Sequence, residues 1–357
     1  MGIHIQNETA NKFASELQFA SVNQKSSLPF IRHTLAARSI VEKGEIFQTM
    51  VIGGSFYQKA LMQKTNGAIT MLSHSHGAQP VFLLAETLME FLAKHIDPQV
   101  KTVALNFAYP LKPVNRDGRL DGTLANGSKE NTFEGLVGHV LGEQIEKYFR
   151  DEQNRILKVS CANDTICLLL SGLMHYHWDH LSAGIVGTGL NFAIFLDEHT
   201  VVNLESAEFD KFEQSEAGKV IDASSVSPGS ALIEKEVSGA YLHHHFNIEA
   251  QKRGLVLDKI TTTKMIDEYA KNEDENVARL AKDILENSAS LVAAQIGGIL
   301  QFCKRDLLFI MQGSLYWRGY QYKETVEKHV QELAPNYHAS YEQVLHSDLY
   351  GAAKLVG

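Results

Sequence analysis

The sequence predicts an α/β protein of two domains, and three observations support this prediction. The chain has 357 residues, too many for one small core, and its 44% hydrophobic and 21% charged residues are typical of a globular protein. Strand-like and helical apolar patterns alternate along it. Two similar glycine turns between strand-like segments, Gly53-Gly54 and Gly187-Thr188-Gly189, indicate a unit that occurs twice, once in each domain.

The first half of the chain sets out this alternation. The polar residues 1–27 fit either a loose arm or a short helix. Residues 46–52 and 57–61 are strand-like and flank the first glycine turn, which predicts a β-hairpin. Apolar residues at helical spacing predict a helix over 81–92, and a continuous apolar run predicts a buried strand over 102–107.

The second half repeats the pattern. We expect a helix over 166–174 introduced by Asp164, strands over 183–186 and 192–196, a solvated charged helix over 267–286, a buried helix over 290–302 and a strand over 307–311.

Composition excludes several classes of function. The net charge is −9 and no block of Lys and Arg stands out, which argues against a nucleic-acid partner. Three cysteines, Cys161, Cys167 and Cys303, are too few for a disulfide framework and indicate buried thiols in a reducing compartment. No apolar run reaches membrane-spanning length, so we expect a cytoplasmic protein without a membrane partner.

The glycine turns carry the first chemical signal. Backbone N–H groups at such turns can bind phosphate without charged side chains, and Ser55 and Thr188 add a hydroxyl to each turn. Asp164 lies at a strand-to-helix junction, where rigid elements hold a carboxylate in place. The structural alternative is that Asp164 caps the helix that follows.

Eight short segments extend these signals. They are Val51-Ile52-Gly53-Gly54-Ser55, Asn106-Phe107-Ala108-Tyr109-Pro110, Ser128-Lys129, Asn163-Asp164-Thr165, Ile185-Val186-Gly187-Thr188-Gly189-Leu190-Asn191, Asn203-Leu204-Glu205, Glu234-Lys235 and Gln312-Gly313-Ser314-Leu315-Tyr316. In this order they resemble the hexokinase family of the actin-like ATPase superfamily, and the resemblance runs from about Leu28 to Gly357.

The resemblance implies a fold. It is the two-domain actin-like ATPase fold, a duplicated RNase H-like α/β fold in which an interdomain cleft separates two mixed sheets flanked by helices. The small domain would comprise residues 45–160 with a C-terminal tail of about 341–357. The large domain would comprise 161–340 with the N-terminal arm, 1–44. Either a monomer or a homodimer is expected.

The resemblance also implies an activity, the ATP- and Mg²⁺-dependent transfer of the γ-phosphoryl group to the 6-hydroxyl of a hexose, with glucose as the expected sugar and glycolysis as the setting. Asp164 would be the catalytic base, and Lys129 would offset charge on the phosphoryl group. The expected sugar-binding residues are Ser128, Lys129, Asn163, Asp164, Asn191, Glu205 and Glu234. The expected nucleotide-binding residues are Gly53, Gly54, Ser55, Gly187, Thr188, Gly189, Gly313 and Ser314.

Some positions depart from the family pattern. Val51 replaces an Asp that helps to hold Mg-ATP, so no side chain is predicted as a metal ligand. Gln58 replaces an Arg, Ala108 a Ser and Gln312 an Asp. These departures leave a second interpretation open, a sugar-binding protein of this family with weak or no catalytic activity.

Two histidine clusters support other interpretations. The string His175-x-His177-x-Asp179-His180 fits the metal motif of the metallo-β-lactamase fold and would make the protein a metal-dependent hydrolase. That motif should follow a strand, whereas a helix is predicted before it here. His243-His244-His245 is interpreted as a solvated turn.

Overall fold

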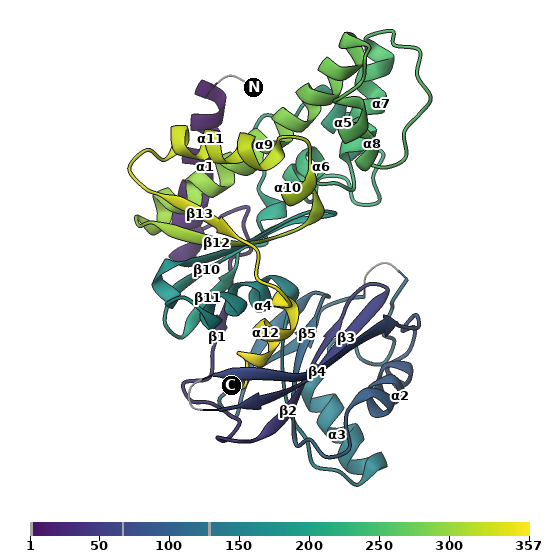
Figure 1. The fold of residues 1–357 in the computed structure, drawn as a ribbon, viewed down its shortest axis with the longest axis vertical. Coiled ribbons are helices and arrows are strands. Elements are labelled where there is room, and N and C mark those ends of the chain that lie inside the picture. Colours follow the sequence, from purple (N-terminus) through teal and green to yellow (C-terminus); the bar gives the residue numbers. More distant parts are fainter. Residues whose placement is uncertain (1–2, 66–67, 128–129) are drawn as a thin grey trace. The chain divides into compact units, whose positions relative to one another are not determined.

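The computed structural model describes residues 3–65, 68–127 and 130–357. Chain contacts divide it into two compact units (Figure 1). Unit 1 comprises residues 1–30, 184–192 and 204–342, and unit 2 comprises residues 31–183, 193–203 and 343–357. The predicted domain boundaries at residues 45, 160 and 341 stay a prediction.

Unit 2 is built on a five-stranded sheet with the order β4 (Ile69–Ala78), β3 (Phe56–Lys64), β2 (Ile46–Ile52), β5 (Thr102–Phe107) and β8 (Lys158–Ala162). The predicted hairpin is confirmed, because β2 pairs with β3 in antiparallel register across the glycine turn. The predicted strand at 102–107 is confirmed as β5, which pairs in parallel with β2 and β8.

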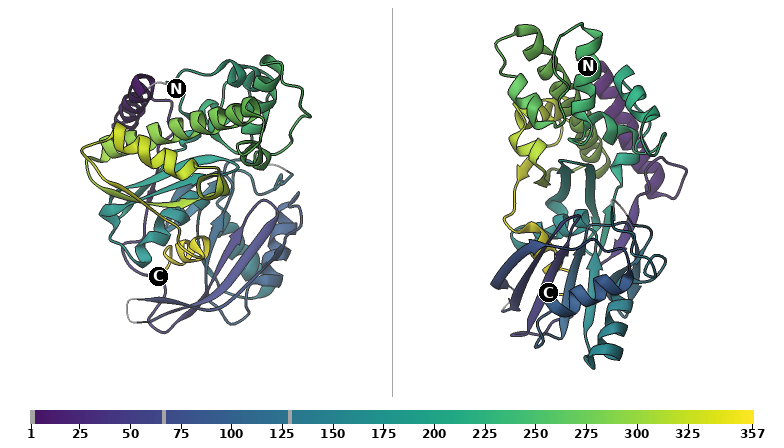
Figure 2. Two further views of the ribbon diagram at one scale, coloured as in Figure 1. Left: turned by 45° about the horizontal axis from the view of Figure 1, so that its top comes forward. Right: turned by 90° about the vertical axis from the view of Figure 1, so that its right-hand side faces the viewer.

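Side chains alternate between the two faces of this sheet. One face carries Met50, Leu105 and Val159 and packs on α2 (Ala85–His95) and α3 (Leu141–Gln153) to form an apolar core. The other face carries Val51 and Asn106 and is covered by α12 (Ser347–Ala353), drawn in yellow in Figures 1 and 2, and by α4 (Asp164–Ser171). The same unit includes a small hairpin of β6 (Leu111–Arg116) and β7 (Arg119–Leu124).

A second sheet has six strands in the order β1 (Ile31–Thr34), β11 (Thr200–Asn203), β10 (Leu190–Asp197), β9 (Leu181–Val186), β12 (Leu307–Gln312) and β13 (Ala339–Glu342). Both β1 and β10 pair with β11 in antiparallel fashion, and β12 pairs with β13 in parallel. The strands predicted at 183–186, 192–196 and 307–311 are therefore present.

The helices of unit 1 surround α9 (Glu275–Cys303), in which residues 288–300 are all buried. Helix α1 (Ile3–Ser21) packs closely on α9, since a Cβ on Gly298 would lie 2.9 Å from the Ala10 carbonyl oxygen. On α11 (Tyr322–Leu333), Tyr322 hydrogen-bonds Ser288 of α9 at 2.6 Å. The remaining helices of this unit are α5 (Glu216–Ala223), α6 (Leu232–Val237), α7 (Leu242–Lys252), α8 (Lys264–Tyr269) and α10 (Ser314–Arg318).

Several predicted elements differ from those observed. The N-terminal segment is neither a loose arm nor a short helix but the 19-residue α1. The helix expected at 81–92 is α2, which starts at Ala85, because the Phe82 and Leu83 carbonyl oxygens accept the N–H groups of Phe133 and Glu134 instead of N–H groups of a helix. The helix expected at 267–286 is wrong, since α8 ends at Tyr269 and the next helix begins at Glu275. That helix, α9, also includes the buried segment expected at 290–302.

Among the described residues, no helix combines the length and apolar character that crossing a membrane requires.

Candidate functional site

The junction of β8 and α4 holds Asn163 and Asp164. Asn163 is the residue that caps α4, because its Oδ1 accepts the N–H of Ile166 at 3.0 Å. Asp164 is the first residue of the helix, so the interpretation of Asp164 as the cap is wrong. Its Oδ1 accepts the Thr165 N–H at 2.8 Å and the Thr165 hydroxyl at 3.3 Å.

The carboxyl group of Asp164 has a raised pKa. Burial is the largest cause, and the negative charge of Asp348 adds to it, while the hydrogen bonds from Thr165 act in the opposite direction. A carboxylate with a raised pKa is a stronger base than an exposed one, which suits it to accept a proton from an alcohol.

The first glycine turn is held by its carbonyl groups. The Gly53 carbonyl oxygen accepts hydrogen bonds from the Tyr109 hydroxyl and the Gln79 side chain, each at 2.7 Å. The Gly54 carbonyl oxygen accepts one from Asn131 at 3.5 Å. Three side chains of unit 2 therefore hold the predicted phosphate turn, and its Ser55 is exposed.

The second glycine turn, in unit 1, packs against two other backbone segments. A Cβ on Gly187 would lie 3.1 Å from the Gly313 Cα, and Gly313 has a φ of 115° that favours glycine. On the other side, the Gly239 N–H donates to the Gly187 carbonyl oxygen at 2.7 Å. Unit 1 thus brings the predicted phosphate turn and the predicted adenosine segment together, with Thr188 and Ser314 both exposed.

The predicted sugar-binding residues of unit 1 lie next to this turn. Oε2 of Glu234 accepts the Leu190 N–H at 2.8 Å, and a Cβ on Gly189 would lie 2.9 Å from the same oxygen. Burial raises the pKa of Glu234. Oδ1 of Asn191 accepts the Ser206 N–H at 3.2 Å, which brings Asn191 beside the backbone that follows Glu205.

Glu205 has an uncommon backbone conformation. Its φ of 48° lies in the left-handed region, which side chains other than glycine adopt at an energetic cost. The next residue, Ser206, begins the 3₁₀ helix η3 (Ser206–Glu208) and is held by Gln295 of α9, whose Nε2 donates to the Ser206 carbonyl oxygen at 3.0 Å. The buried α9 therefore maintains the strained turn on which Glu205 lies.

The predicted site residues thus form one group in each unit. Unit 2 holds Asn163, Asp164 and the first glycine turn, and unit 1 holds Asn191, Glu205, Glu234, the second glycine turn, Gly313 and Ser314. Ser128 and Lys129 lie outside the described residues.

Sequence reasoning missed Asp348. This residue lies in the first turn of α12, and its charge acts on Asp164. The only signal in the sequence is an acidic residue three positions before Gly351.

The two histidine clusters do not have the structures expected of a metal motif or a solvated turn. His177 and Asp179 flank the start of η2 (Trp178–His180) and follow a helical segment rather than a strand. His243 to His245 lie on α7, so the predicted solvated turn is wrong, and His245 is buried with its Nε2 2.8 Å from the Lys235 carbonyl oxygen. No three His, Cys, Asp or Glu side chains within the described ranges are arranged to hold a metal ion.

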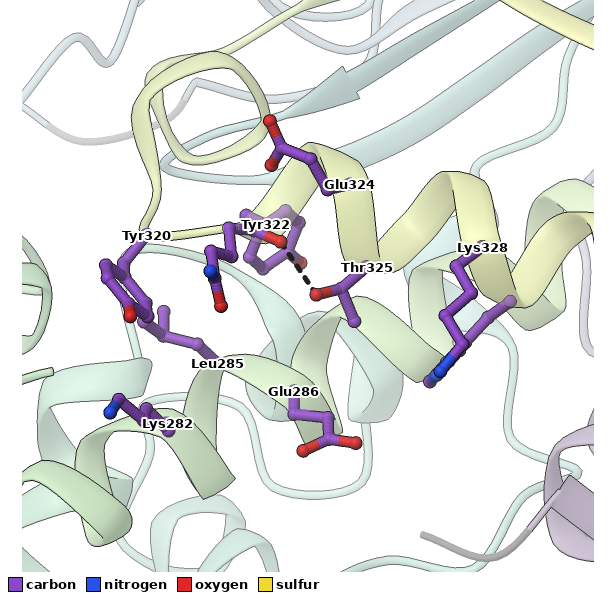
Figure 3. Close-up of a pocket in the computed structure, with 10 residues that line it drawn as sticks. Lys282, Leu285, Glu286, Tyr320, Tyr322, Glu324, Thr325 and Lys328 are labelled. Carbon is purple, nitrogen blue, oxygen red and sulfur yellow. Dashed lines mark hydrogen bonds between the residues drawn. The ribbon is translucent and has the colours of Figure 1, made fainter.

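A pocket of about 600 Å³ opens between α9 and α11 in unit 1 (Figure 3). Lys282 and Glu286 line it from α9, and Tyr320 and Lys328 line it from α11 and the segment before it. The ammonium group of Lys282 lies 5.8 Å from the centre of the Tyr320 ring. None of the predicted site residues lines this pocket.

Sequence comparison finds curated relatives of one kind. Hexokinase-1 of Pongo abelii and of Homo sapiens are each 25% identical to the chain over 369 residues, which cover 83% of this chain and 40% of theirs. The hexokinase of Schistosoma mansoni is 26% identical over 253 residues, which cover 62% of this chain and 55% of the relative. The chain therefore spans less than half the length of the first two, and no family model matches it.

Structure comparison extends the similarity to the whole chain. The Schistosoma mansoni hexokinase complexed with glucose superimposes with a TM-score of 0.76 and 20% identity, covering 100% of this chain and 95% of the other. The chain therefore has the fold of the hexokinases. A ROK family glucokinase from Streptomyces griseus, solved with glucose and AMPPNP, superimposes with a TM-score of 0.56 and 17% identity over 87% of this chain.

The chain has the actin-like ATPase fold that the resemblance implied, with its sheets flanked by helices. The structure argues against the metallo-β-lactamase interpretation, because the histidine string lies in a different fold and does not follow a strand.

Proposed function

We propose that the protein is an ATP-dependent hexose kinase that transfers the γ-phosphoryl group to the 6-hydroxyl of a hexose, with Asp164 as the base. The observation that carries this proposal is the position of Asp164, a carboxylate with a raised pKa held at the start of α4 in a hexokinase-like fold. Asp164 accepts the hydroxyl proton as the oxygen attacks the phosphorus.

The sugar is a ring of hydroxyl groups, and it requires amides and carboxylates that hydrogen-bond them. Asn163 supplies such a group in unit 2, and Asn191, Glu205 and Glu234 supply them in unit 1. The named complex of the Schistosoma mansoni hexokinase with glucose supports glucose as the substrate.

The nucleotide is bound by backbone N–H groups of the two glycine turns, with Gly313 and Ser314 beside the second turn. The glucokinase solved with AMPPNP supports ATP as the donor. Lys129 neutralises charge on the transferred group. Mg²⁺ would supply further positive charge to the phosphates.

A coupled assay with ATP and a panel of glucose, fructose and mannose tests this function. We expect Asp164→Asn to lower kcat by about 10²–10⁴-fold, because the variant cannot accept the proton, while the Kd for the sugar changes little. The Kd is measured by calorimetry on both proteins. The control is Asp117→Asn, which makes the same change at a side chain that is 84% exposed in the same unit.

Equal activity of Asp164→Asn and the parent protein would reject Asp164 as the base. A parent protein that binds glucose but phosphorylates none of the sugars would favour the alternative that Val51 motivates, a sugar-binding protein without catalysis.

A further inference from the structure

Two acidic side chains of unit 2 lie in the first turns of two helices that pack together. Asp164 begins α4 and Asp348 is the second residue of α12. The helices approach so closely that a Cβ on Gly351 would overlap the Cys167 carbonyl oxygen. This contact fixes α12 beside α4, on the same face of the five-stranded sheet.

Two strands hold Asp348 in place. Nε2 of Gln58 on β3 donates to Oδ2 of Asp348, and Nδ2 of Asn106 on β5 donates to its carbonyl oxygen, each at 3.4 Å. Gln58 and Asn106 are the residues that pair with Val51 of β2 on its two sides. Asp348 is therefore positioned over Val51, the position at which a carboxylate was expected from the resemblance.

The two carboxyl groups interact electrostatically. The negative charge of Asp348 raises the pKa of Asp164, in addition to the larger effect of burial. Burial and both carboxylates together raise the pKa of the Cys167 thiol, which lies on α4. Two like charges in a partly buried environment are unfavourable unless a positive charge accompanies them.

Asn106 gives an independent indication of a ligand. Its side chain is fully buried, and its Oδ1 has no hydrogen-bond partner within the described part of the chain. A buried amide oxygen without a donor costs about 1–3 kcal/mol, so such atoms usually mark a missing water or ion. The Nδ2 of the same amide donates to the Asp348 carbonyl oxygen, so the orphaned oxygen belongs to a side chain that contacts the acidic residue of α12.

The donor set has the chemistry of a magnesium site. Mg²⁺ prefers oxygen ligands, keeps several waters and is usually held by one or two carboxylates together with substrate phosphates. Two carboxylates and one amide oxygen fit this pattern. The described residues contain no group of three His, Cys, Asp or Glu side chains that could hold a metal ion. The proposed set does not require one, because its third ligand is an amide oxygen.

We propose that Asp348, with Asp164 and Asn106, forms the site for the divalent cation that accompanies the nucleotide, so that α12 supplies the carboxylate that β2 lacks at Val51. This inference rests on the proposed kinase function for the identity of the phosphate ligand. The residues of the site all belong to unit 2.

Mn²⁺ tests the site, because it accepts the same oxygen ligands and its free form is measured by electron paramagnetic resonance. The full chain is titrated with Mn²⁺, without nucleotide and then with AMPPNP. Loss of a group that only orients a metal ligand costs about 10–100-fold in affinity, so loss of a direct ligand in Asp348→Asn should weaken Mn²⁺ binding by at least about tenfold. Sugar affinity should not change.

A second variant keeps the test decisive if the first perturbs folding. Val51→Asp added to Asp348→Asn moves the carboxylate from α12 to β2, between Gln58 and Asn106, and should recover Mn²⁺ binding. Asp117→Asn is the control and should bind Mn²⁺ as the parent does. Circular dichroism melting curves check that each variant is folded.

Unchanged Mn²⁺ affinity in a folded Asp348→Asn would overturn the site. If that variant keeps Mn²⁺ affinity and the parent phosphorylates hexose, the cation site fails and the kinase function stands. If Mn²⁺ binding depends on Asp348 and no sugar is bound or phosphorylated, the cation site stands and the kinase function fails.

Discussion

The carboxyl group of Asp164 is surrounded by groups that act on its pKa in opposite directions. Burial and Asp348 raise the pKa above the usual value of 3.8, and the hydrogen bonds from Thr165 lower it, with a net rise. The rise affects both catalysis and stability, because protonation of a catalytic base removes activity and a pKa that changes on folding makes stability depend on pH.

The stability consequence has a definite sign. A carboxyl group whose folded-state pKa exceeds its unfolded-state pKa binds its proton more tightly in the folded state. The free energy of unfolding therefore falls as pH rises from the unfolded-state pKa through the folded-state pKa. We compare the free energy of unfolding of the parent protein with that of Asp164→Asn, measured by urea unfolding without metal. The parent value minus the variant value should be lower at pH 7 than at pH 3. The same difference at both pH values would contradict the raised pKa.

Residue-level prediction from the sequence succeeded where a local pattern decided the outcome. The pair Asn163-Asp164 at a strand-to-helix junction was found correctly, although Asn163 rather than Asp164 is the cap. Asp348 could not be found in this way, because its relation to Asp164 depends on the packing of α12 against α4, which no short sequence pattern encodes.

At the scale of elements, the contact between α4 and α12 depends on the absence of a side chain at Gly351. We expect Gly351→Ala to destabilise the protein by about 1–3 kcal/mol, because the added methyl group overlaps the Cys167 carbonyl oxygen and forces the helices apart. Urea unfolding measures the change. The matched control is Gly297→Ala on α9, where the nearest atom would be the Leu333 Cβ at 3.2 Å.

Helix propensity alone predicts the opposite sign for Gly351→Ala, since Ala is favoured over Gly inside helices by about 1 kcal/mol. A variant as stable as the parent, or more stable, would therefore show that α4 and α12 are less tightly packed than described.

Strands were predicted from the sequence more accurately than helices. The buried strand β5 has the predicted bounds because a continuous apolar run between polar residues has few alternatives. The sequence pattern predicted two helices, one charged and one apolar, where the structure has the single helix α9. Composition indicates how exposed each part of a helix is, but it does not indicate where the helix begins or ends. The single Asp274, whose side chain accepts the N–H groups of Asn276 and Val277, marks the actual start.

The stability of the molecule also depends on an ion-pair network that joins three elements of unit 2. Glu146 of α3 accepts hydrogen bonds from Arg116 at 2.5 and 3.0 Å, from Arg119 at 2.6 Å and from the Val159 N–H at 2.7 Å. It therefore ties α3 to the β6–β7 hairpin and to β8. Although burial acts to raise the pKa of Glu146, these hydrogen bonds and the arginine charges outweigh it and lower the pKa.

We expect Glu146→Gln to destabilise the protein by about 1–3 kcal/mol at pH 7, because it removes the carboxylate that Arg116 and Arg119 share and leaves them only Asp121 and Asp117 as counter-charges. The lowered pKa means that the contribution of Glu146 is present above its unfolded-state pKa and is lost as pH falls through the folded-state pKa. The difference in unfolding free energy between parent and variant should therefore shrink on acidification. The exposed pair Lys219 and Glu216 provides the control, and Glu216→Gln should leave the free energy of unfolding nearly unchanged.

The division of unit 2 between distant parts of the sequence has a consequence for synthesis on the ribosome. Strands β2, β5 and β8 leave the exit tunnel together with α4 but long before α12, so the sheet face that carries Val51 and Asn106 stays only partly covered in the nascent chain until residues 347–353 emerge. Translation that stops early would release a polypeptide whose sheet face lacks the cover of α12 and whose Asp164 has no acidic neighbour from that helix.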